Sequence, residues 1–334
     1  MNRTNSPPEA VSKTLGNRPP ELPGVPGVSV VVINWNTRDM TLDCLASVFE
    51  HTRDVSVEVI VVDNASTDGS AQAIAQRFPQ VTLIANRENR GFAAANNQAM
   101  RQARGRYWLL LNSDTLVLDA VIAASARYLD EHADVGAMGC RVLNDDRTVQ
   151  LTCSRYPTLA NLLLLTSGLW KLNRPRWLGR YAYKHWQRDS ERDVDTVSGC
   201  YLMARRQACE QVGLFDEAFF FFGEETDWCR RFREAGWRVA FSPVGEIVHY
   251  GSVSARKLNH RRDIMLTQAM VRLHRKHAGV AAALAAYVLL MGFNLSRMIF
   301  WQLTRLTDSP RAKERARHFT QVVAHARECW AEKG

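Results

Sequence analysis

Polar and acidic side chains follow each of four apolar runs in the first 115 residues. The groups are Asn34, Trp35 and Asn36 after the first run, Asp63 and Asn64 after the second, Asn89 and Arg90 after the third with Asn96 one helical turn later, and Asn112, Ser113 and Asp114 after the fourth. Ligands of open parallel sheets bind beyond the carboxyl ends of the strands, where backbone N–H groups and helix N-termini converge. One such strand end is usually only a helix cap. Four together predict a binding site.

The sequence lacks two common nucleotide-binding loops. It contains no G-x-x-x-x-G-K-[ST] motif, and Asn-Trp-Asn stands after the first run in place of G-x-G-x-x-G. A nucleotide would be held by Asp63 or Asn64 on the base or ribose, by Trp35 packing against the base, and by a metal on the phosphates. Asp114 is the metal candidate, because a carboxylate at the end of a buried run suits Mg²⁺ or Mn²⁺; a helix N-cap is an equal alternative for this residue. His249, taken alone, is more often structural than a ligand.

A second acidic cluster follows four consecutive phenylalanines. Glu224, Glu225 and Asp227 come directly after Phe219–Phe222. Apolar surroundings raise the pKa of a carboxyl group, which makes it a more effective general base near neutral pH. The alternative is that these carboxylates only favour a helix N-terminus through its dipole. We expect both: one carboxylate does chemistry, and the others cap or position.

The elements that must hold these groups alternate between strand and helix. Strands are expected at 28–33, 57–62, 81–85, 107–111, 135–142 and 238–241, and helices at 37–50, 69–77, 92–104, 120–131, near 205–212 and at 226–235. This alternation predicts right-handed crossovers and a parallel sheet covered on both faces. Residues 151–195 show no clear period and are rich in Trp and Tyr: Tyr156, Trp170, Trp177, Tyr181, Tyr183 and Trp186.

Composition and charge indicate a globular body with a basic tail. The 334 residues are 46% hydrophobic and 23% charged, which excludes a fully disordered, collagen-like or coiled-coil chain. Residues 255–334 hold 15 Lys or Arg and 5 Asp or Glu, so the net charge of +9 belongs to the tail. This distribution argues against a nucleic-acid-binding core and for a basic appendage near something anionic. Seven scattered cysteines without a secretory signal indicate reduced thiols in the cytosol.

The two ends of the chain differ from the body. Residues 1–27 hold six of the 11 prolines and predict a disordered leader. Residues 278–293 are nearly all apolar but shorter than the roughly 20 residues that span a bilayer. Basic residues flank them between 272 and 317, which suits a helix lying in an anionic membrane surface. The alternative is a helical hairpin packed on the body, with a homodimer as a further option.

Six segments, in this order, carry a family resemblance: VVINWN, VDNASTDGS, ENRGFAAANN, LLNSDT, GLFDEAFFFFGEETDWCRRFREAGW and VHYGSVS. They resemble family 2 inverting glycosyltransferases of the GT-A fold, and among these bacterial rhamnosyltransferases and related cell-surface polysaccharide enzymes. The resemblance covers about residues 28–254. It implies an α/β nucleotide-diphospho-sugar transferase fold with a mostly parallel central sheet flanked by helices. Residues 28–114 would bind the nucleotide, 115–254 the acceptor, and 255–334 would form a helical appendage.

The resemblance also implies a role for individual residues. Asn34, Trp35, Asn36, Asp63 and Asn64 would contact the nucleoside, Arg90 and Asn96 the base or phosphates, Asn112, Ser113 and Asp114 would form the metal motif with His249 as a second metal ligand, Glu225 would be the catalytic base, and Gly199, Glu224 and Asp227 would serve the acceptor or positioning. Two positions depart from the family pattern. The metal motif begins with Asn112, so only one of its side chains is acidic, and the base is Glu where Asp is commoner.

The implied reaction is a single in-line displacement assisted by Mg²⁺ or Mn²⁺. A sugar would move from a nucleoside-diphosphate donor to a hydroxyl of a growing cell-surface glycan or lipid-linked acceptor; the resemblance alone favours dTDP-rhamnose. The enzyme would be cytoplasmic, peripheral on the inner face of the cytoplasmic membrane, and would bind no nucleic acid. The alternatives are a non-catalytic nucleotide-sugar-binding protein on the same fold and a nucleotidyltransferase. The latter would need a basic, Gly-rich loop near the first strand, which the sequence lacks.

Overall fold

The computed structural model describes residues 24–172, 178, 181–251, 258–305 and 309–330. Most of the expected leader therefore lies outside the described residues, as do Trp177 and the side chain of Trp170. All seven cysteines are described, and each is a buried, free thiol.

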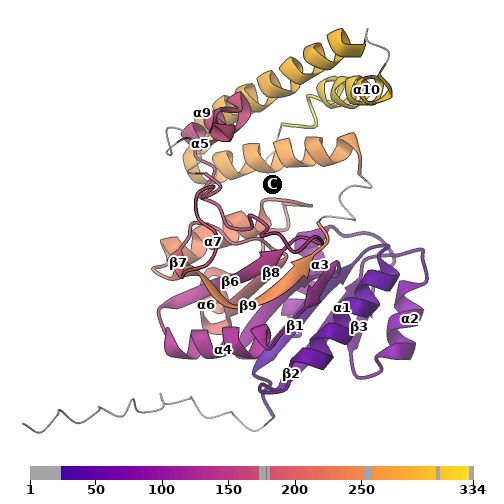
Figure 1. The fold of residues 1–334 in the computed structure, drawn as a ribbon, viewed down its shortest axis with the longest axis vertical. Coiled ribbons are helices and arrows are strands. Elements are labelled where there is room, and N and C mark those ends of the chain that lie inside the picture. Colours follow the sequence, from indigo (N-terminus) through magenta and orange to yellow (C-terminus); the bar gives the residue numbers. More distant parts are fainter. Residues whose placement is uncertain (1–23, 173–177, 179–180, 252–257, 306–308, 331–334) are drawn as a thin grey trace, which may run out of the picture.

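One mixed sheet runs through the body in the order β3-β2-β1-β4-β8-β6-β9-β5, with β7 added beside β9 (Figure 1). Its strands are β1 (Val28–Asn34), β2 (Val57–Asp63), β3 (Thr82–Ala85), β4 (Tyr107–Asn112), β5 (Thr115–Val117), β6 (Val135–Leu143), β7 (Arg192–Asp193), β8 (Tyr201–Arg205) and β9 (Arg238–His249). Strands β1 to β4 pair in parallel, as the alternating pattern predicts.

The second half of the sheet is mixed where the sequence predicted a mostly parallel one. Strand β8 runs antiparallel to both β4 and β6. The physical reason is the path of residues 144–200, which leave β6 and enter β8 at the same edge of the sheet. That edge is the carboxyl end of β1 and β4, where the predicted site lies.

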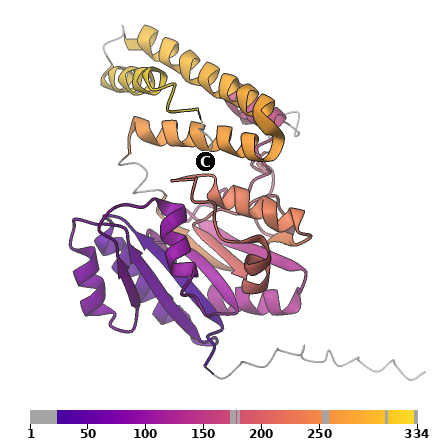
Figure 2. The same ribbon diagram turned by 180° about the vertical axis from the view of Figure 1, so that it is seen from behind.

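Two layers of helices cover the sheet, as Figures 1 and 2 show from opposite sides. On one face lie α1 (Arg38–His51), α2 (Ser70–Arg77) and α4 (Val121–Glu131), and on the other α3 (Phe92–Met100), α6 (Arg206–Val212) and α7 (Glu224–Glu234). Each face has its own hydrophobic core, because the central strands are buried on both sides. The rigid sheet thereby fixes the positions of the loops at its carboxyl edge.

The aromatic segment contains a helix that the period of the sequence does not reveal. Helix α5 (Leu159–Ser167) is followed by the short helix η1 (Leu169–Lys171). The stretch LANLLLLTS is apolar on nearly every side, so it has no 3.6-residue alternation to detect. Its start is marked instead by Thr158, whose hydroxyl accepts a hydrogen bond from the backbone N–H of Asn161.

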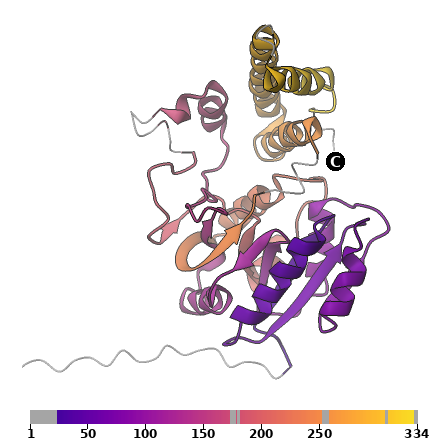
Figure 3. The same ribbon diagram turned by 45° about the vertical axis from the view of Figure 1, so that its right-hand side comes forward.

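The tail forms a helical layer above the body. Helix α9 (His260–Thr304) bends at Gly279, where φ is 83°, and α10 (Pro310–Ala324) packs against it. Figure 3 shows the first half of α9 lying above the sheet, with the second half and α10 farther out. The hairpin that the sequence left as an alternative is therefore present. The second half of α9 nevertheless keeps an exposed apolar face. The hairpin packing therefore leaves an apolar surface for contact with a membrane.

Candidate active site

A cleft opens at the carboxyl ends of β1, β2 and β4, with about 690 Å³ of empty space. One wall is polar and the other largely aromatic; the lining residues are Ile33, Trp35, Asn64, Asn89, Gly91, Phe92, Asn112, Ser113, Asp114, Phe220, Phe221 and Leu258. Five of them are site residues expected from the sequence. The combination of amide and carboxylate groups with aromatic rings suits a ligand that has both a ring and a charged part.

The strand register explains why these groups meet. Asn34 lies opposite Asp63 across β1 and β2, and Ile33 lies opposite Asn112 across β1 and β4. The Asn34 amide donates to the Asp63 carboxylate at 2.6 Å, and the second oxygen of Asp63 accepts from the backbone N–H of Ser66 at 3.1 Å. Two loops that are 29 residues apart are thus tied together at the floor of the site.

Asn34 joins two loops of the site. Its side chain is fully buried and does not line the cleft, and its side-chain oxygen accepts from the hydroxyls of Thr37 and Thr41 at 2.8 Å each. Asn36 likewise joins the two loops, because its side-chain oxygen accepts from the backbone N–H of Thr67 at 2.7 Å. The nucleoside contacts expected of both residues stay predictions.

Asn64 organises the third loop of the site. Its amide nitrogen donates to Asn89 at 2.8 Å and to the carbonyl of Gly91 at 3.2 Å, while its oxygen accepts from the backbone N–H of Arg90. Asn96 is buried and its amide donates to the carbonyl of Phe92, one turn earlier, so it does not reach the cleft. The contact of Asn96 with base or phosphates stays a prediction, and its amide makes a helix-internal hydrogen bond here.

The two expected metal ligands lie side by side. Antiparallel pairing of β5 with β9 sets Thr115 opposite His249, and the Nε2 atom of His249 lies 3.3 Å from a carboxylate oxygen of the preceding Asp114. Asn112 places its amide nitrogen 3.3 Å from the same Nε2 atom. Burial lowers the pKa of His249, but Cys200 and Asp114 together outweigh it and raise the pKa to about 10. A metal ion at this place would take the position of the Nε2 proton, because only the neutral imidazole ligates a metal.

Gln150 is a site residue that the sequence did not reveal. Its side-chain oxygen lies 2.7 Å from Nδ1 of His249, and its amide nitrogen donates to Asn144 and to the carbonyl of His249. These contacts fix the imidazole of His249 on its Nδ1 side, so that Nε2 points toward Asp114. Such outer partners orient metal-ligating histidines. Nothing in the local sequence identifies Gln150 as a site residue. Only its contact with His249 in the folded protein does so.

Asp114 and His249 fit a divalent metal that also binds a ligand's phosphates. They supply one carboxylate and one imidazole, both largely buried, and Asp114 faces the cleft. Across the described parts of the chain no group of three or more His, Cys, Asp or Glu residues is arranged to hold a metal by itself. A metal here would be completed by other oxygen ligands, as Mg²⁺ and Mn²⁺ commonly are at phosphate sites.

The aromatic wall is a loop docked onto the start of α3. The backbone N–H of Phe92 donates to the carbonyl of Phe220 at 2.7 Å, and the rings of Phe92 and Phe221 meet edge to face. Gly91 permits this approach, since a Cβ there would lie 2.5 Å from the Phe220 oxygen. The sequence directed attention to this phenylalanine run only as the surroundings of the acidic cluster. Together with Leu258, Phe220 and Phe221 in fact line the cleft.

The acidic cluster occupies the first turn of α7, next to the aromatic wall. Burial, with the charge of Glu225 beside it, raises the pKa of Glu224 well above its usual range. Burial also raises the pKa of Glu225. Asp227 differs: burial raises its pKa, but His277, Arg231 and Lys276 outweigh this effect and lower the pKa to about 2. One short segment thus holds two carboxyls that take up protons readily and one permanent anion.

Glu225, Gly199 and Arg90 lie outside the lining of the cleft. Glu225 stands in the first turn of α7, which follows the phenylalanine loop that lines the cleft. Gly199 stands close to the ring of Phe92, where a Cβ would be 3.8 Å from the ring edge. Arg90 is exposed.

Comparison with known proteins decides the family. The sequence pattern described as "Glycosyl transferase family 2" matches residues 29–213. The chain belongs to glycosyltransferase family 2. The resemblance and the GT-A fold expected from the sequence are confirmed.

Curated relatives are enzymes and proteins of cell-surface glycan synthesis. The N-acetylglucosaminyl-diphospho-decaprenol L-rhamnosyltransferase of Mycobacterium tuberculosis is 31% identical over 58% of this chain and 66% of its own length. The O-antigen biosynthesis protein RfbC of Myxococcus xanthus is 27% identical over 70% of this chain and 18% of its own length. The chain therefore spans less than two thirds of each of these relatives.

Solved structures share the fold of this chain. The mannosyltransferase PcManGT of Pyrobaculum calidifontis, in complex with GDP-Man and Mn²⁺, has a TM-score of 0.54 at 19% identity, over 92% of this chain and 88% of its own. GalNAc-T7 with UDP, GalNAc and Mn²⁺ has a TM-score of 0.53 at 14% identity, over 76% of this chain and 48% of its own. At such identities the likeness establishes the fold alone.

Gly91→Ala tests the docking of the aromatic wall. Gly91 has φ 81° and ψ 171°, a region open essentially to glycine, so alanine should cost about 1–3 kcal/mol of stability. The methyl group should also displace Phe220 and weaken binding of a nucleoside diphosphate, measured by calorimetry. Gly236→Ala is the control, because Gly236 has φ +88° but open space around its Cβ position. Equal loss of nucleotide binding in both variants would show that the contact with Phe220 is irrelevant to the cleft.

Proposed function

We propose that this protein is a metal-dependent, inverting glycosyltransferase that moves a sugar from a nucleoside diphosphate to an acceptor hydroxyl. The observation that carries the proposal is the contact of His249, at 3.3 Å, with Asp114, which lines the polar floor of a cleft whose other wall leads directly into Glu224 and Glu225. A non-catalytic binding protein would have no need for buried carboxyls with raised pKa values beside such a cleft.

The cleft supports a nucleoside diphosphate as the donor's carrier. Trp35 and the aromatic wall offer surfaces for a base, and Asn64 lines the cleft directly after β2, with Asp63 buried beside it. Asp114 and His249 would hold Mg²⁺ or Mn²⁺, which neutralises charge on the departing diphosphate. Neighbours in fold were solved with GDP-Man or UDP and with Mn²⁺. The rhamnosyltransferase relative favours dTDP-rhamnose as the first donor to try.

Glu225 is the base in the mechanism we propose. Its carboxylate takes the proton from the acceptor hydroxyl as that oxygen attacks the anomeric carbon on the face opposite the diphosphate. The bond to the diphosphate breaks as the new glycosidic bond forms, so the configuration at the anomeric carbon inverts. Burial raises the pKa of Glu225 and thereby brings it closer to that of an effective base near neutral pH.

The acceptor side of the site would be built by residues 151–200, which return to this edge of the sheet. Tyr181 lies near Glu225, and Gly199 lies next to Phe92. The mycobacterial relative is named for a diphospho-decaprenol acceptor, so a lipid-linked glycan is the acceptor class we propose. On this proposal the body (28–254) carries out the reaction, and the tail (255–334) brings it to the acceptor.

The tail supports attachment to an anionic membrane on the cytoplasmic side. Its second half exposes large apolar side chains at spacings of four and seven residues, which lie on one helix face: Val280, Leu284, Val288, Leu295, Ile299 and Leu303. This helix also has the length and apolar composition to cross a membrane, with 17% of its most apolar window buried. Exposed basic residues of α10, including Arg311 and Arg315, lie alongside. We propose a helix lying in the surface.

Asp114→Ala tests the metal site. Because Asp114 supplies the one carboxylate of the predicted metal site, its loss should lower the Mn²⁺-dependent part of dTDP affinity at least about tenfold. Calorimetric titration of dTDP with and without Mn²⁺ measures this difference. Asp145→Ala, which removes an exposed carboxylate from the turn after β6, is the matched control. A metal dependence that survives in Asp114→Ala would move the metal elsewhere.

Glu225→Gln tests the base. Removing the Glu225 carboxylate should lower kcat by about 10²- to 10⁴-fold while dTDP affinity stays unchanged. Because the active form is the carboxylate and its pKa is raised, wild-type kcat should fall with decreasing pH at a higher pH than an exposed Glu would allow, and Glu225→Asp should retain an acid limb. Nucleoside diphosphate released only when acceptor is added separates transfer from binding. Near-wild-type kcat in Glu225→Gln would place the base elsewhere.

Combined replacement of Leu284, Val288 and Ile299 by serine tests the membrane face. At roughly 1 kcal/mol per side chain, binding to vesicles containing phosphatidylglycerol should weaken about 100-fold. Co-sedimentation measures it, with Leu151→Ser as the control, because Leu151 is exposed on the body. Unchanged vesicle binding, or loss of a dimer instead of vesicle binding, would show that the face serves another partner.

A further inference from the structure

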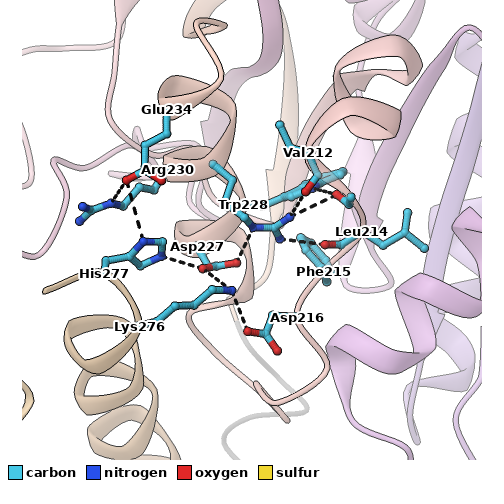
Figure 4. Close-up of polar contacts among 12 residues, drawn as sticks. Val212, Leu214, Phe215, Asp216, Asp227, Trp228, Arg230, Glu234, Lys276 and His277 are labelled. Carbon is cyan, nitrogen blue, oxygen red and sulfur yellow. Dashed lines mark hydrogen bonds and ion pairs between the residues drawn. The ribbon is translucent and has the colours of Figure 1, made fainter. Parts of the chain in front are cut away.

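Asp227 is a fully buried carboxylate in the first turn of the helix that begins with Glu224 and Glu225. Three cationic or hydrogen-bonding side chains surround it (Figure 4). Arg231 donates to one oxygen at 2.8 Å, while Lys276 and His277 approach the other oxygen at 2.9 and 2.8 Å. A buried anion held in this way has little freedom to move, since losing a partner leaves an uncompensated charge.

The partners of Asp227 come from two different parts of the chain. Arg231 belongs to α7 itself and also donates to the carbonyls of Val212 and Leu214, in the loop before the phenylalanine run. Lys276 and His277 belong to the first half of α9, and Lys276 reaches Asp216 as well, at 2.7 Å. The tail is therefore tied by charge to the helix that carries the proposed base.

Apolar packing supports the same contact. Ala269 and Leu273 of α9 form a small buried cluster with Phe219, and Arg262 lies over the ring of Phe222 at 5.7 Å. Gly223, at the junction of the phenylalanine loop and α7, lies so close to α9 that a Cβ there would be 3.2 Å from the Cβ of Ala269. The first half of α9 thus covers the backbone that leads into Glu224 and Glu225.

Asp227 holds α7 at the turn from which Glu225 projects. One residue separates Glu225 from Asp227 within the first turn of α7, so a rotation of α7 that moved Glu225 would also pull Asp227 from its partners. Glu224 has a buried carboxyl oxygen with no hydrogen-bond partner among the described residues, so it does not anchor this turn. The anchoring falls to Asp227 and, through it, to the tail.

We propose that Lys276 and His277 are positioning residues for catalysis: by clasping Asp227 they set the orientation of Glu225 toward the acceptor. This inference rests on the proposed role of Glu225 as the base. It makes the first half of α9 part of the catalytic unit, while the exposed half beyond Gly279 is left for attachment. An ion pair that only fixes the tail to the body would leave kcat unchanged in a folded variant.

We call the contacts of Lys276 and His277 with Asp227 the clasp. The test compares substitutions that remove the clasp with substitutions that preserve it, all in the full chain. His277→Phe keeps a ring but removes the donor, and His277→Gln restores an N–H near the position of Nε2. Likewise, Lys276→Met removes the positive charge at this position, and Lys276→Arg preserves it. His318→Phe is the matched control, because His318 makes a 2.8 Å contact with Asp263 entirely within the tail.

We expect His277→Phe and Lys276→Met to lower kcat by about tenfold to 100-fold with the affinity for dTDP and Mn²⁺ unchanged. His277→Gln and Lys276→Arg should stay within a few-fold of wild type, as should His318→Phe. Hydrogen exchange should accelerate in residues 219–227 of the two disruptive variants, but not in residues 28–114. Exchange is read without substrate, so it reports the clasp independently of the reaction.

Several results would overturn the proposal. They are a wild-type kcat in folded His277→Phe, an equal loss of kcat in His318→Phe, or exchange in residues 219–227 that does not change. A wild-type protein without transfer activity would instead refute the proposed function. Glu225→Gln distinguishes the two, because it should abolish transfer and leave exchange in residues 219–227 at the wild-type rate.

Discussion

The antiparallel pairing of β5 with β9 is the constraint on which the polar half of the site depends. It closes the sheet at its far end and brings Asp114 against His249, although 135 residues separate them. The helix cap that the sequence left as an alternative for Asp114 is not formed, because β5 follows this residue and the N-cap of α4 is Ala120. Gln150 also contributes, because its side-chain oxygen contacts Nδ1 of His249 and fixes the imidazole. The metal-binding potential of this chain is therefore a property of sheet topology as much as of residue type.

The acidic cluster shows how environment divides three similar side chains. Glu224, Glu225 and Asp227 share one helical turn and the same helix dipole, so neither sequence nor dipole distinguishes them. Their neighbours do. Burial without a cationic partner raises the pKa of both glutamates, whereas three partners keep Asp227 ionised. A base and an anchor can then occupy adjacent positions without competing for the same proton.

Most of the fold could be predicted because hydrophobic period and strand-end chemistry are local signals. Strands β1 to β4 and their helices follow from such signals within a residue or two at most boundaries, although α3 ends at Met100, four residues early. Helix α5 could not, because a helix that is apolar all round has no period. The direction of the Asn34 side chain could not be predicted for a related reason. A polar residue at a strand end can face the ligand or the next loop, and only the register between β1 and β2 decides which.

The clasp of Lys276 and His277 on Asp227 could not be predicted from the sequence, for a different reason. Lys276 and His277 stand in a basic tail where charge alone favours an anionic surface, and nothing local distinguishes them from the other cations there. Their partner, Asp227, lies about 50 residues earlier in the chain. Gly279 explains how one continuous helix serves two surroundings. Its φ of 83° bends α9 directly after His277, so the half that packs on Phe219 turns away from the half that exposes Val280 and Leu284. A straight helix would have carried the apolar stripe onward along the direction of the first half, close to the body, where it could not lie flat on a surface. The bend lets the same element hold α7 at one end and leave its apolar face open at the other.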